Sequence, residues 1–264
     1  MNADAGYIFP RHSSEVDRLD LQHYALREAV GASYLAPVLR PHLALDAGCG
    51  SGQWAYDLCA EFPEALVIGI DLLPSKPNRP ANYCFVRSNL LQGLPFVDGR
   101  FDFVHQRLLG GGVPLKSWPA VVNDLVRVAR PGGWIELVEV GFEIEPAGPA
   151  TRRIVELMQQ LGTSMGLDTT GIVIRSLGEY LLQAGVTDVK TRSMAIPIGE
   201  WAGRIGSFMA SDFRAGATRM CDVFQARFGL SAAECQDLLA RMPQEWEEVR
   251  SALSFAFAFG RKQR

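Results

Sequence analysis

The stretch that most constrains the fold of this chain runs from Leu43 to Trp54 and reads L-A-L-D-A-G-C-G-S-G-Q-W. An apolar run ends in Asp46, three glycines follow at alternate positions, and a segment suited to a helix comes next. Glycine permits positive φ and lets a ligand lie against bare backbone. The first N–H groups of a helix have no partner within it. The pattern therefore predicts a strand, a tight turn and a helix start that together hold a ligand.

The spacing of the glycines differs from that of dinucleotide-binding turns. The dinucleotide fingerprint G-x-G-x-x-G would put its third glycine at position 53. Here that position is Gln53, and the glycine is Gly52. A glycine turn alone is a weak signal, because many tight turns use glycine. Other parts of the chain must therefore support the assignment of a ligand.

Beyond this stretch, apolar runs suited to buried strands alternate with segments suited to helices. Helices are predicted at about 53–62 and 117–130, and strands at about 43–47, 66–70, 83–87, 101–105 and 134–140. Leu66–Ile70 is an uninterrupted apolar run, which is typical of a parallel strand buried on both faces. This alternation predicts an α/β fold with a doubly wound, mostly parallel sheet.

The two flanks of this core differ from it. Before it, the sequence predicts a helix that begins near Ser13 and ends near Val30, and a second short helix over Ala32–Leu39. After Pro149 it predicts helices at 150–165 and 173–184, a strand over 186–198, a mainly helical stretch over 201–249 and a final strand near 255–259. Ser231-Ala-Ala-Glu234 is a capping-box pattern for the last helix. We therefore expect a helical cap inserted before the last strand.

Composition excludes several classes of partner. A net charge of −3 over 264 residues gives no electrostatic footprint for nucleic acid, and no apolar run reaches the roughly 18 residues of a membrane helix. Met1–Pro10 lacks the basic start and apolar core of a signal peptide, so none is expected. Five cysteines form no C-x-x-C pair, and we expect reduced thiols in a cytoplasmic protein. Four scattered histidines give no metal cluster.

Polar residues mark the ends of the predicted strands, where open parallel sheets bind their ligands. Asp71 ends the second strand near the roughly 20-residue distance at which a carboxylate takes both ribose hydroxyls. The alternative for Asp71 is a helix N-cap. Asn89 follows the third strand, where an amide and a backbone N–H suit the edge of an adenine ring. Its alternative is an ordinary turn residue.

These motifs, in this order over about residues 40–140, resemble those of class I S-adenosylmethionine (SAM)-dependent methyltransferases. D-A-G-C-G-S-G stands for the first motif, and I-G-I-D ends in the ribose acid. S-N-L-L-Q-G-L-P-F is similar to the adenine loop of the family, with Asn89 in place of the usual Asp. F-D-F-V-H-Q-R and R-P-G-G-W-I-E-L stand for the fourth and fifth strands. The resemblance implies SAM as cofactor and a Rossmann-like, seven-stranded, mostly parallel sheet with an antiparallel last strand.

A narrower resemblance covers the front of the chain. Y-I-F-P, E-V-D-R-L-D-L-Q-H, H-Q-R-L-L and S-W-P look like the LaeA-like, TAM-type methyltransferases of fungi and bacteria, whose bacterial members often serve natural-product pathways. In that group the N-terminal helix lies over the SAM site. The resemblance thus implies that Gln22, His23 and Tyr24 close the pocket. The alternative is that they are surface polar residues of a helix packed on the core.

The resemblance also implies a set of cofactor contacts from the first motif and the strand ends. These contacts, with those from the N-terminal helix, are Asp46, Gly48, Cys49, Gly50, Gly52, Asp71, Leu72, Asn89, Leu90, His105, Gln106, Gln22 and Tyr24.

Methyl transfer itself is an in-line displacement from a sulfonium cation. It needs a nucleophile held about 3 Å from the methyl group in a site without water. A general base is needed only where the nucleophile carries a proton of high pKa. The predicted bases are His105, Glu139 and His23, with His105 favoured because in the family that strand end lies beside the methionine half of SAM. The alternatives are a structural histidine, and a glutamate that caps a loop or binds a substrate cation.

We therefore predict one methyltransferase domain over 1–264. N-terminal lid helices cover 1–40, the SAM-binding core 41–145, and a substrate-side half 146–264, whose helical cap spans about 201–249. The expected function is methyl transfer to a small, largely apolar metabolite in natural-product biosynthesis. Two alternatives stay open: a SAM-binding protein that assists another reaction such as cyclisation, and a LaeA-like regulatory protein. The sequence is also compatible with a homo-oligomer.

Overall fold

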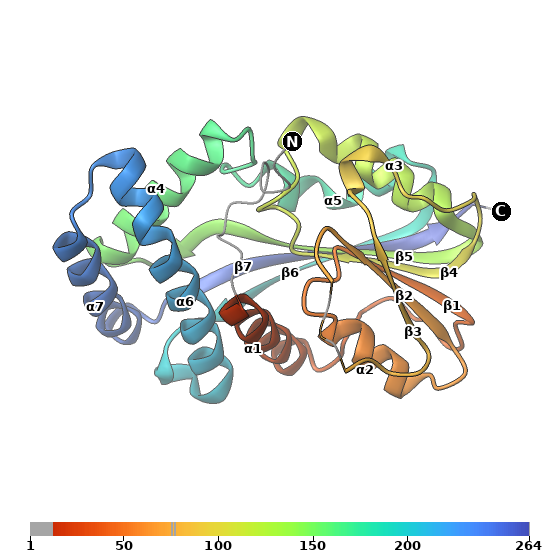
Figure 1. Cartoon of the computed structure of the whole chain (residues 1–264), viewed down its shortest axis with the longest axis horizontal. Helices are drawn as coiled ribbons and strands as arrows, with labels where there is room; N and C mark the ends of the chain where they lie inside the picture. Colours follow the sequence, from red (N-terminus) through yellow and green to blue (C-terminus); the bar gives the residue numbers. More distant parts are fainter. Residues whose placement is uncertain (1–12, 75, 77, 264) are drawn as a thin grey trace.

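The computed structural model describes residues 13–74, 76 and 78–263. These residues form one seven-stranded sheet with helices on both faces (Figure 1). Met1–Pro10, for which we predict no signal peptide, lies outside the described residues. Within them, no helix combines the length and the apolar character needed to cross a bilayer.

The elements follow in the order expected for alternating strands and helices. The strands are β1 (Leu43–Ala47), β2 (Leu66–Asp71), β3 (Tyr83–Arg87), β4 (Phe101–Arg107), β5 (Ala129–Glu145), β6 (Val186–Pro197) and β7 (Ala252–Lys262). The helices are α1 (Ser13–Val30), α2 (Gln53–Glu61), α3 (Trp118–Val128), α4 (Pro149–Ser164), α5 (Ile172–Gln183), α6 (Gly203–Phe228) and α7 (Ala232–Val249). Single 3-10 turns lie at Leu90–Gln92, Leu115–Ser117 and Glu200–Ala202.

The sheet topology confirms the predicted fold class. The strand order is β3-β2-β1-β4-β5-β7-β6, and the pairs from β3 to β5 are all parallel. Strand β7 runs antiparallel to both β5 and β6. The chain passes from β1 outward to β3 and then returns to β4 on the other side of β1. The crevice between the carboxyl ends of β1 and β4 is therefore the switch point at which such sheets bind ligands.

Helices cover both faces of the sheet (Figure 1), and alternate residues of the strands pack against different helices. Ala44 and Phe103 pack with α2, through Trp54 among others, on one face. On the opposite face, Leu45 and Val104 pack with α3 and α5. Because side chains alternate along a strand, neighbouring residues of β4 and β5 serve different layers.

A third apolar cluster joins α1 to the helical insert. It gathers side chains of α1, α4, α6 and α7 and of the distal ends of β5, β6 and β7. Met220, Phe224 and Trp246 are among its fully buried members. The cluster packs α1 against the insert. In Figure 1, α4, α6 and α7 lie on the left, and α1 lies beside α6.

The predicted short helix over Ala32–Leu39 is wrong, because this segment is irregular. The backbone N–H groups of Leu35 and Ala36 instead donate to Glu136 Oε2 on β5, at 2.7 and 2.6 Å. Pro37 has no N–H group to continue a helix. A buried carboxylate from a distant strand thus outcompetes the local helical pattern.

Two other elements differ in extent from the sequence expectation. Strand β5 begins at Ala129 and includes Gly132 and Gly133, where we expected a break before the strand; its pairing with β4 shifts register between Phe101 and Phe103. The helical stretch of the insert divides into α6 and α7. The predicted capping box is confirmed at Ser231, whose Oγ accepts the Glu234 N–H at 3.2 Å.

The prediction that all cysteines are reduced thiols is wrong for two of them. Cys221 of α6 and Cys235 of α7 form a disulfide with a Cα–Cα distance of 6.0 Å. Cys49, Cys59 and Cys84 are free. The paired cysteines are 14 residues apart and meet only because α6 and α7 pack against each other, so their spacing carried no signal.

Candidate functional site

The predicted glycine turn connects β1 to α2 beside the switch point. Gly48, Gly50 and Gly52 have φ values of 76°, 53° and 85°, a region that residues with side chains rarely adopt. The N–H groups of Gly48 and Cys49 donate to the Ile70 carbonyl at 2.8 and 3.0 Å, which ties the turn to the end of β2. The glycines therefore let the backbone bend sharply at the carboxyl edge of the sheet.

Two leucines from separate parts of the chain lie against this turn. A Cβ atom on Gly48 would collide with the Leu109 side chain from the loop after β4. A Cβ atom on Gly50 would lie 3.1 Å from Leu19 Cδ1 of α1. Because the turn has no side chains at Gly48 and Gly50, an apolar side chain can lie close to its backbone at each of these positions.

Asp71 ends β2 next to the turn, as predicted. Its Oδ2 accepts the Gly50 N–H at 3.0 Å, and its Oδ1 accepts the Leu72 and Leu73 N–H groups at 2.6 and 3.2 Å. The residue is half-buried. The carboxylate is therefore held in place by three backbone donors, while contact with a ribose stays a prediction for Asp71 and Leu72.

Asn89 has the turn role that we weighed as its alternative. Its side-chain oxygen accepts the Leu91 N–H at 2.9 Å and caps the 3-10 turn Leu90–Gln92. Leu90 is half-buried at the start of that turn. The turn places both residues just after β3, and their contact with an adenine ring stays a prediction.

Asp46 and His105 are register partners on β1 and β4, directly below the turn. His105 Nδ1 lies 3.2 Å from Asp46 Oδ1, and its ring stacks on Trp54 with centroids 3.7 Å apart. Burial lowers the pKa of His105 to about 4, against the opposing influence of Asp46. Asp46 Oδ2 and His105 Nε2 are buried without a hydrogen-bond partner. His105 is thus a neutral ring sealed under Trp54, and a base role requires that it be uncovered.

His23 of α1 is inserted between two elements of the core. Its Nε2 lies 2.9 Å from Asp57 Oδ2 on α2, and its Nδ1 lies 3.2 Å from a guanidinium nitrogen of Arg107 on β4. Arginine can only donate, so Nδ1 accepts and Nε2–H donates to Asp57. Burial lowers the pKa of His23, and the hydrogen bond to Asp57 opposes this. His23 therefore links α1 to the sheet as a neutral ring.

The other predicted lid residues lie on different sides of α1. Gln22 Nε2 donates to Asp212 Oδ2 on α6 at 3.1 Å, and Arg18 forms a buried ion pair with Asp212 Oδ1 at 2.6 Å. Tyr24 is 39% exposed and contacts the His23 ring edge-on. Helix α1 is thus fixed to the insert and to the core, while cofactor contacts of Gln22 and Tyr24 stay predictions.

Gln106 and Glu139 lie on the opposite face of the sheet, toward α3 and α5. Glu139 Oε1 accepts hydrogen bonds from Gln106 Nε2 and, at 2.6 Å, from the Leu109 N–H. Its Oε2 accepts the Gly110 N–H at 3.1 Å. Burial raises the pKa of Glu139 to about 7, and the Leu109 and Gln106 hydrogen bonds partly offset this. Glu139 is therefore a buried carboxylate bound mainly by backbone donors.

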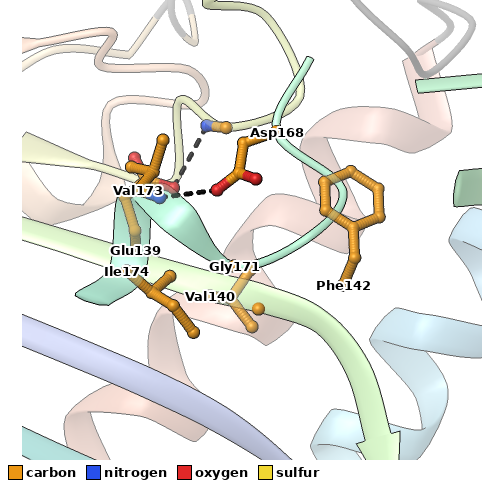
Figure 2. A pocket seen from close by; sticks show the side chains of 9 residues that line it. Glu139, Val140, Phe142, Asp168, Gly171, Val173 and Ile174 are labelled. Carbon is orange, nitrogen blue, oxygen red and sulfur yellow. Dashed lines mark hydrogen bonds between the residues drawn. The ribbon is translucent and has the colours of Figure 1, made fainter. Parts of the chain in front are cut away.

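Glu139 also lines a small recess at the end of β5, shown in Figure 2. The recess is lined by Gly110, Glu139, Val140, Gly141, Phe142, Asp168, Gly171, Val173 and Ile174. Asp168 Oδ2 accepts the Val173 N–H at 2.6 Å near the start of α5. Both carboxylates of the recess are therefore engaged with backbone groups, as the dashed lines of Figure 2 indicate.

Sequence reasoning did not select three charged residues that organise the site. Glu136 is fully buried on β5 with Oε1 unpartnered, and burial raises its pKa to about 7. Asp57 accepts a hydrogen bond from His23, and Asp212 accepts one from Arg18 of α1. A charge inside the apolar strand W-I-E-L was a usable signal for Glu136. Asp57 and Asp212 lie on helices, where an acidic residue is ordinary, so no local pattern marked them.

The chain is similar to several known proteins. The profile of a family described as "Methyltransferase domain" matches residues 44–133. The secondary metabolism regulator laeA of Aspergillus fumigatus is 31% identical over 206 residues, which cover 74% of this chain and 54% of that protein. N-methyltransferase sirN of Leptosphaeria maculans is 28% identical over 274 residues, covering 98% and 95% of the two chains. This chain thus spans about half the length of the laeA relatives it matches.

A solved structure matches nearly the whole fold. It is phosphoethanolamine N-methyltransferase 2 of Haemonchus contortus in complex with phosphomonomethylethanolamine and S-adenosylhomocysteine. The TM-score is 0.55 at 16% sequence identity, with 97% of this chain and 62% of that chain covered. At this identity the match establishes the fold alone.

Proposed function

We propose that this chain, which belongs to the class I SAM-dependent methyltransferases, transfers a methyl group from SAM to a small, largely apolar metabolite. The observation that carries this proposal is the glycine turn at the switch point with Asp46 and Asp71 beside it. Similarity to a protein named N-methyltransferase supports methyl transfer, and similarity to one named secondary metabolism regulator supports a place in natural-product biosynthesis.

The residues at the turn fit SAM. Asp46 Oδ2 is a buried acceptor without a protein partner, which suits the methionyl ammonium group. Asp71 offers a half-buried carboxylate to the ribose hydroxyls, and the bare turn lets the backbone approach the ligand closely. When bound, SAM supplies an electrophilic methyl group on a sulfonium sulfur.

The protein's own contribution is positioning and the exclusion of water. Leu19 and Leu109 wall the turn, and the His23 and Asp212 contacts hold α1 over it. An acceptor with a proton of high pKa needs a base as well, and His105, Glu139 and His23 stay the predicted candidates. Each is almost completely buried, so each would have to be uncovered to take a substrate proton.

We assign the parts of the chain accordingly. The lid lies in 1–40 and has α1 as its described helix; the SAM-binding core covers 41–145, and the substrate-side half covers 146–264. The cap of about 201–249 includes α6 and α7, whose apolar cluster meets α1. A cytoplasmic location, small-molecule partners and a homo-oligomer belong to the same proposal.

A regulatory function is the second candidate, because laeA is 31% identical to this chain. The two candidates differ in turnover. Purified protein is incubated with methyl-labelled SAM and a small-molecule extract, and products are followed by mass spectrometry. A labelled small product formed with equimolar S-adenosylhomocysteine supports methyl transfer. Binding of SAM with no labelled small product, or with only an isomerised one, contradicts it.

Asp71 provides the sharpest test of the cofactor site. Asp71→Ala should weaken SAM binding by about 10- to 100-fold, because hydrogen bonds to a charged group contribute roughly 1.5–3 kcal/mol. Asp237→Ala, which removes an exposed carboxylate on α7, is the control and should bind SAM like the wild type. Unchanged SAM affinity of Asp71→Ala in calorimetry would refute the role.

A further inference from the structure

The loop that follows β4 is unusually rich in glycine and tightly folded. Residues 108–113 read L-L-G-G-G-V. Leu108 has a positive φ of 57°, although it carries a side chain. The Leu109 carbonyl accepts the N–H groups of Gly112 and Val113 at 2.8 and 2.9 Å. Leu108, Leu109 and Val113 pack against the core clusters, whereas the three glycines between Leu109 and Val113 offer no side chain, so that part of the loop depends on hydrogen bonds to its backbone.

Leu109 is the loop's large contact toward the cofactor side. This side chain occupies the space that a Cβ atom on Gly48 would need. Gly48 is therefore required both for the bend of the turn and for the approach of the loop. A displacement of the loop would therefore move Leu109 and change its contact with the glycine turn.

Glu139 is the contact that holds the loop from behind. Its two oxygens accept the consecutive N–H groups of Leu109 and Gly110, at 2.6 and 3.1 Å. Gln106 donates to the same carboxylate and orients it. A Cβ atom on Gly110 would lie 3.1 Å from Glu139 Oε2, so glycine allows this close approach. Hydrogen bonds to a buried carboxylate are among the stronger ones in proteins.

The same contacts argue against a substrate-cation site in the recess of Figure 2. Both Glu139 oxygens already accept from the chain. Asp168 is used likewise, since it accepts the N–H groups of Thr170 and Val173. The carboxylates of the recess therefore serve its architecture.

We propose that Glu139 is a positioning residue: it anchors the 108–113 loop through two backbone N–H groups, places Leu109 against the glycine turn, and so sets the affinity of the turn for the cofactor. The inference rests on the proposed function only in naming SAM as that cofactor. The role proposed here acts through Leu109 and requires no contact between Glu139 and the reacting atoms.

The test compares Glu139→Gln with Glu143→Gln, which changes an exposed glutamate of the same strand. In Glu139→Gln the new amide oxygen can accept one N–H group, but the amide NH₂ group faces the other donor. We expect amide hydrogen exchange at Leu109–Gly110 to become at least about 10-fold faster without ligand. S-adenosylhomocysteine should bind about 10-fold more weakly in calorimetry. Glu143→Gln should match the wild type in both measurements.

Leu109→Ala separates positioning from a general loss of structure. It should weaken S-adenosylhomocysteine binding about as much as Glu139→Gln does, with thermal unfolding close to wild type. If Glu139 acts through Leu109, the double variant should be only slightly weaker than either single variant.

Three results would overturn the assignment: unchanged exchange at Gly110 in Glu139→Gln, wild-type affinity of that variant, or additive losses in the double variant. Failure of the wild type to bind S-adenosylhomocysteine would instead contradict the proposed function. The exchange experiment needs no ligand, so it tests whether Glu139 anchors the loop whether or not the protein binds S-adenosylhomocysteine.

Discussion

Buried charged side chains have different hydrogen-bond partners on the two faces of the central sheet. Toward α1 and α2, β4 and β5 present His105, Arg107 and Glu136. His105 pairs with Asp46, His23 links Arg107 to Asp57, and Glu136 accepts the Leu35 and Ala36 N–H groups, so each set connects separate elements. Toward α3 and α5 they present Gln106 and Glu139, and the Glu139 carboxylate accepts hydrogen bonds from Gln106 and from two N–H groups of the loop after β4.

The difference lies in what remains unpartnered. On the α1 side, Asp46 Oδ2, His105 Nε2 and Glu136 Oε1 are buried without a hydrogen-bond partner. On the other side both Glu139 oxygens are bonded, although the neighbouring Gln106 Oε1 has no partner. Carboxylate oxygens without a partner beside the glycine turn are available to a ligand or to water, whereas the fully bonded Glu139 carboxylate maintains local structure. The first face therefore suits recognition, and the second suits support.

The largest expected effect comes from the first face. His105→Ala removes a fully buried ring stacked on Trp54 and leaves Asp46 without its donor. We expect the free energy of unfolding in urea to fall by about 3 kcal/mol. His42→Ala, at an exposed position, is the control and should change it by less than about 0.5 kcal/mol. A loss below about 1 kcal/mol for His105→Ala would show that its contacts with Asp46 and Trp54 do not stabilise the core.

A smaller effect is expected at Glu136. Glu136→Ala leaves the buried N–H of Ala36 and the partly buried N–H of Leu35 without their acceptor, so the free energy of unfolding should fall by about 2 kcal/mol. The segment 32–39 should then become sensitive to limited proteolysis. Glu143→Ala, on the exposed part of the same strand, should do neither. Equal proteolysis of the two variants would contradict the role of Glu136.

The smallest effect is the pH dependence, in which the acid and the histidine act with opposite sign. The pKa of Glu136 is raised from 4.5 to about 7 on folding. Its contribution to stability is therefore full below pH 4.5 and lost as pH rises through 7. The pKa of His105 is lowered from 6.5 to about 4. Its contribution is full above pH 6.5 and lost as pH falls through 4.

Urea titrations between about pH 4.5 and 7 can separate these two contributions. Glu136→Gln should remove a fall in stability with rising pH, and His105→Gln should remove a rise, each on the order of 1 kcal/mol. Glu139→Gln should resemble Glu136→Gln, because burial raises both carboxyl pKa values to about 7. Shifts of the same sign for His105→Gln and Glu136→Gln would contradict this comparison.

Local pattern was sufficient where each residue's role depends on its neighbours in the sequence. The glycine turn, the end of β2 at Asp71 and the capping box at Ser231 could all be predicted, because backbone conformation and capping act over a few residues. The segment Ala32–Leu39 could not be predicted, because its hydrogen-bond acceptor is Glu136, about a hundred positions away. The disulfide between α6 and α7 escaped for the same reason.

The sequence by itself therefore determined the alternation of strands and helices, the doubly wound sheet and the place of the glycine turn. Periodicity, glycine spacing and chain order are enough for these features. Only the tertiary structure decided that His105 is sealed under Trp54, that His23 joins α1 to β4, and that Glu139 holds the loop bearing Leu109. Burial and hydrogen-bond partners arise when distant segments pack together, and those two properties determine what an ionisable side chain can do.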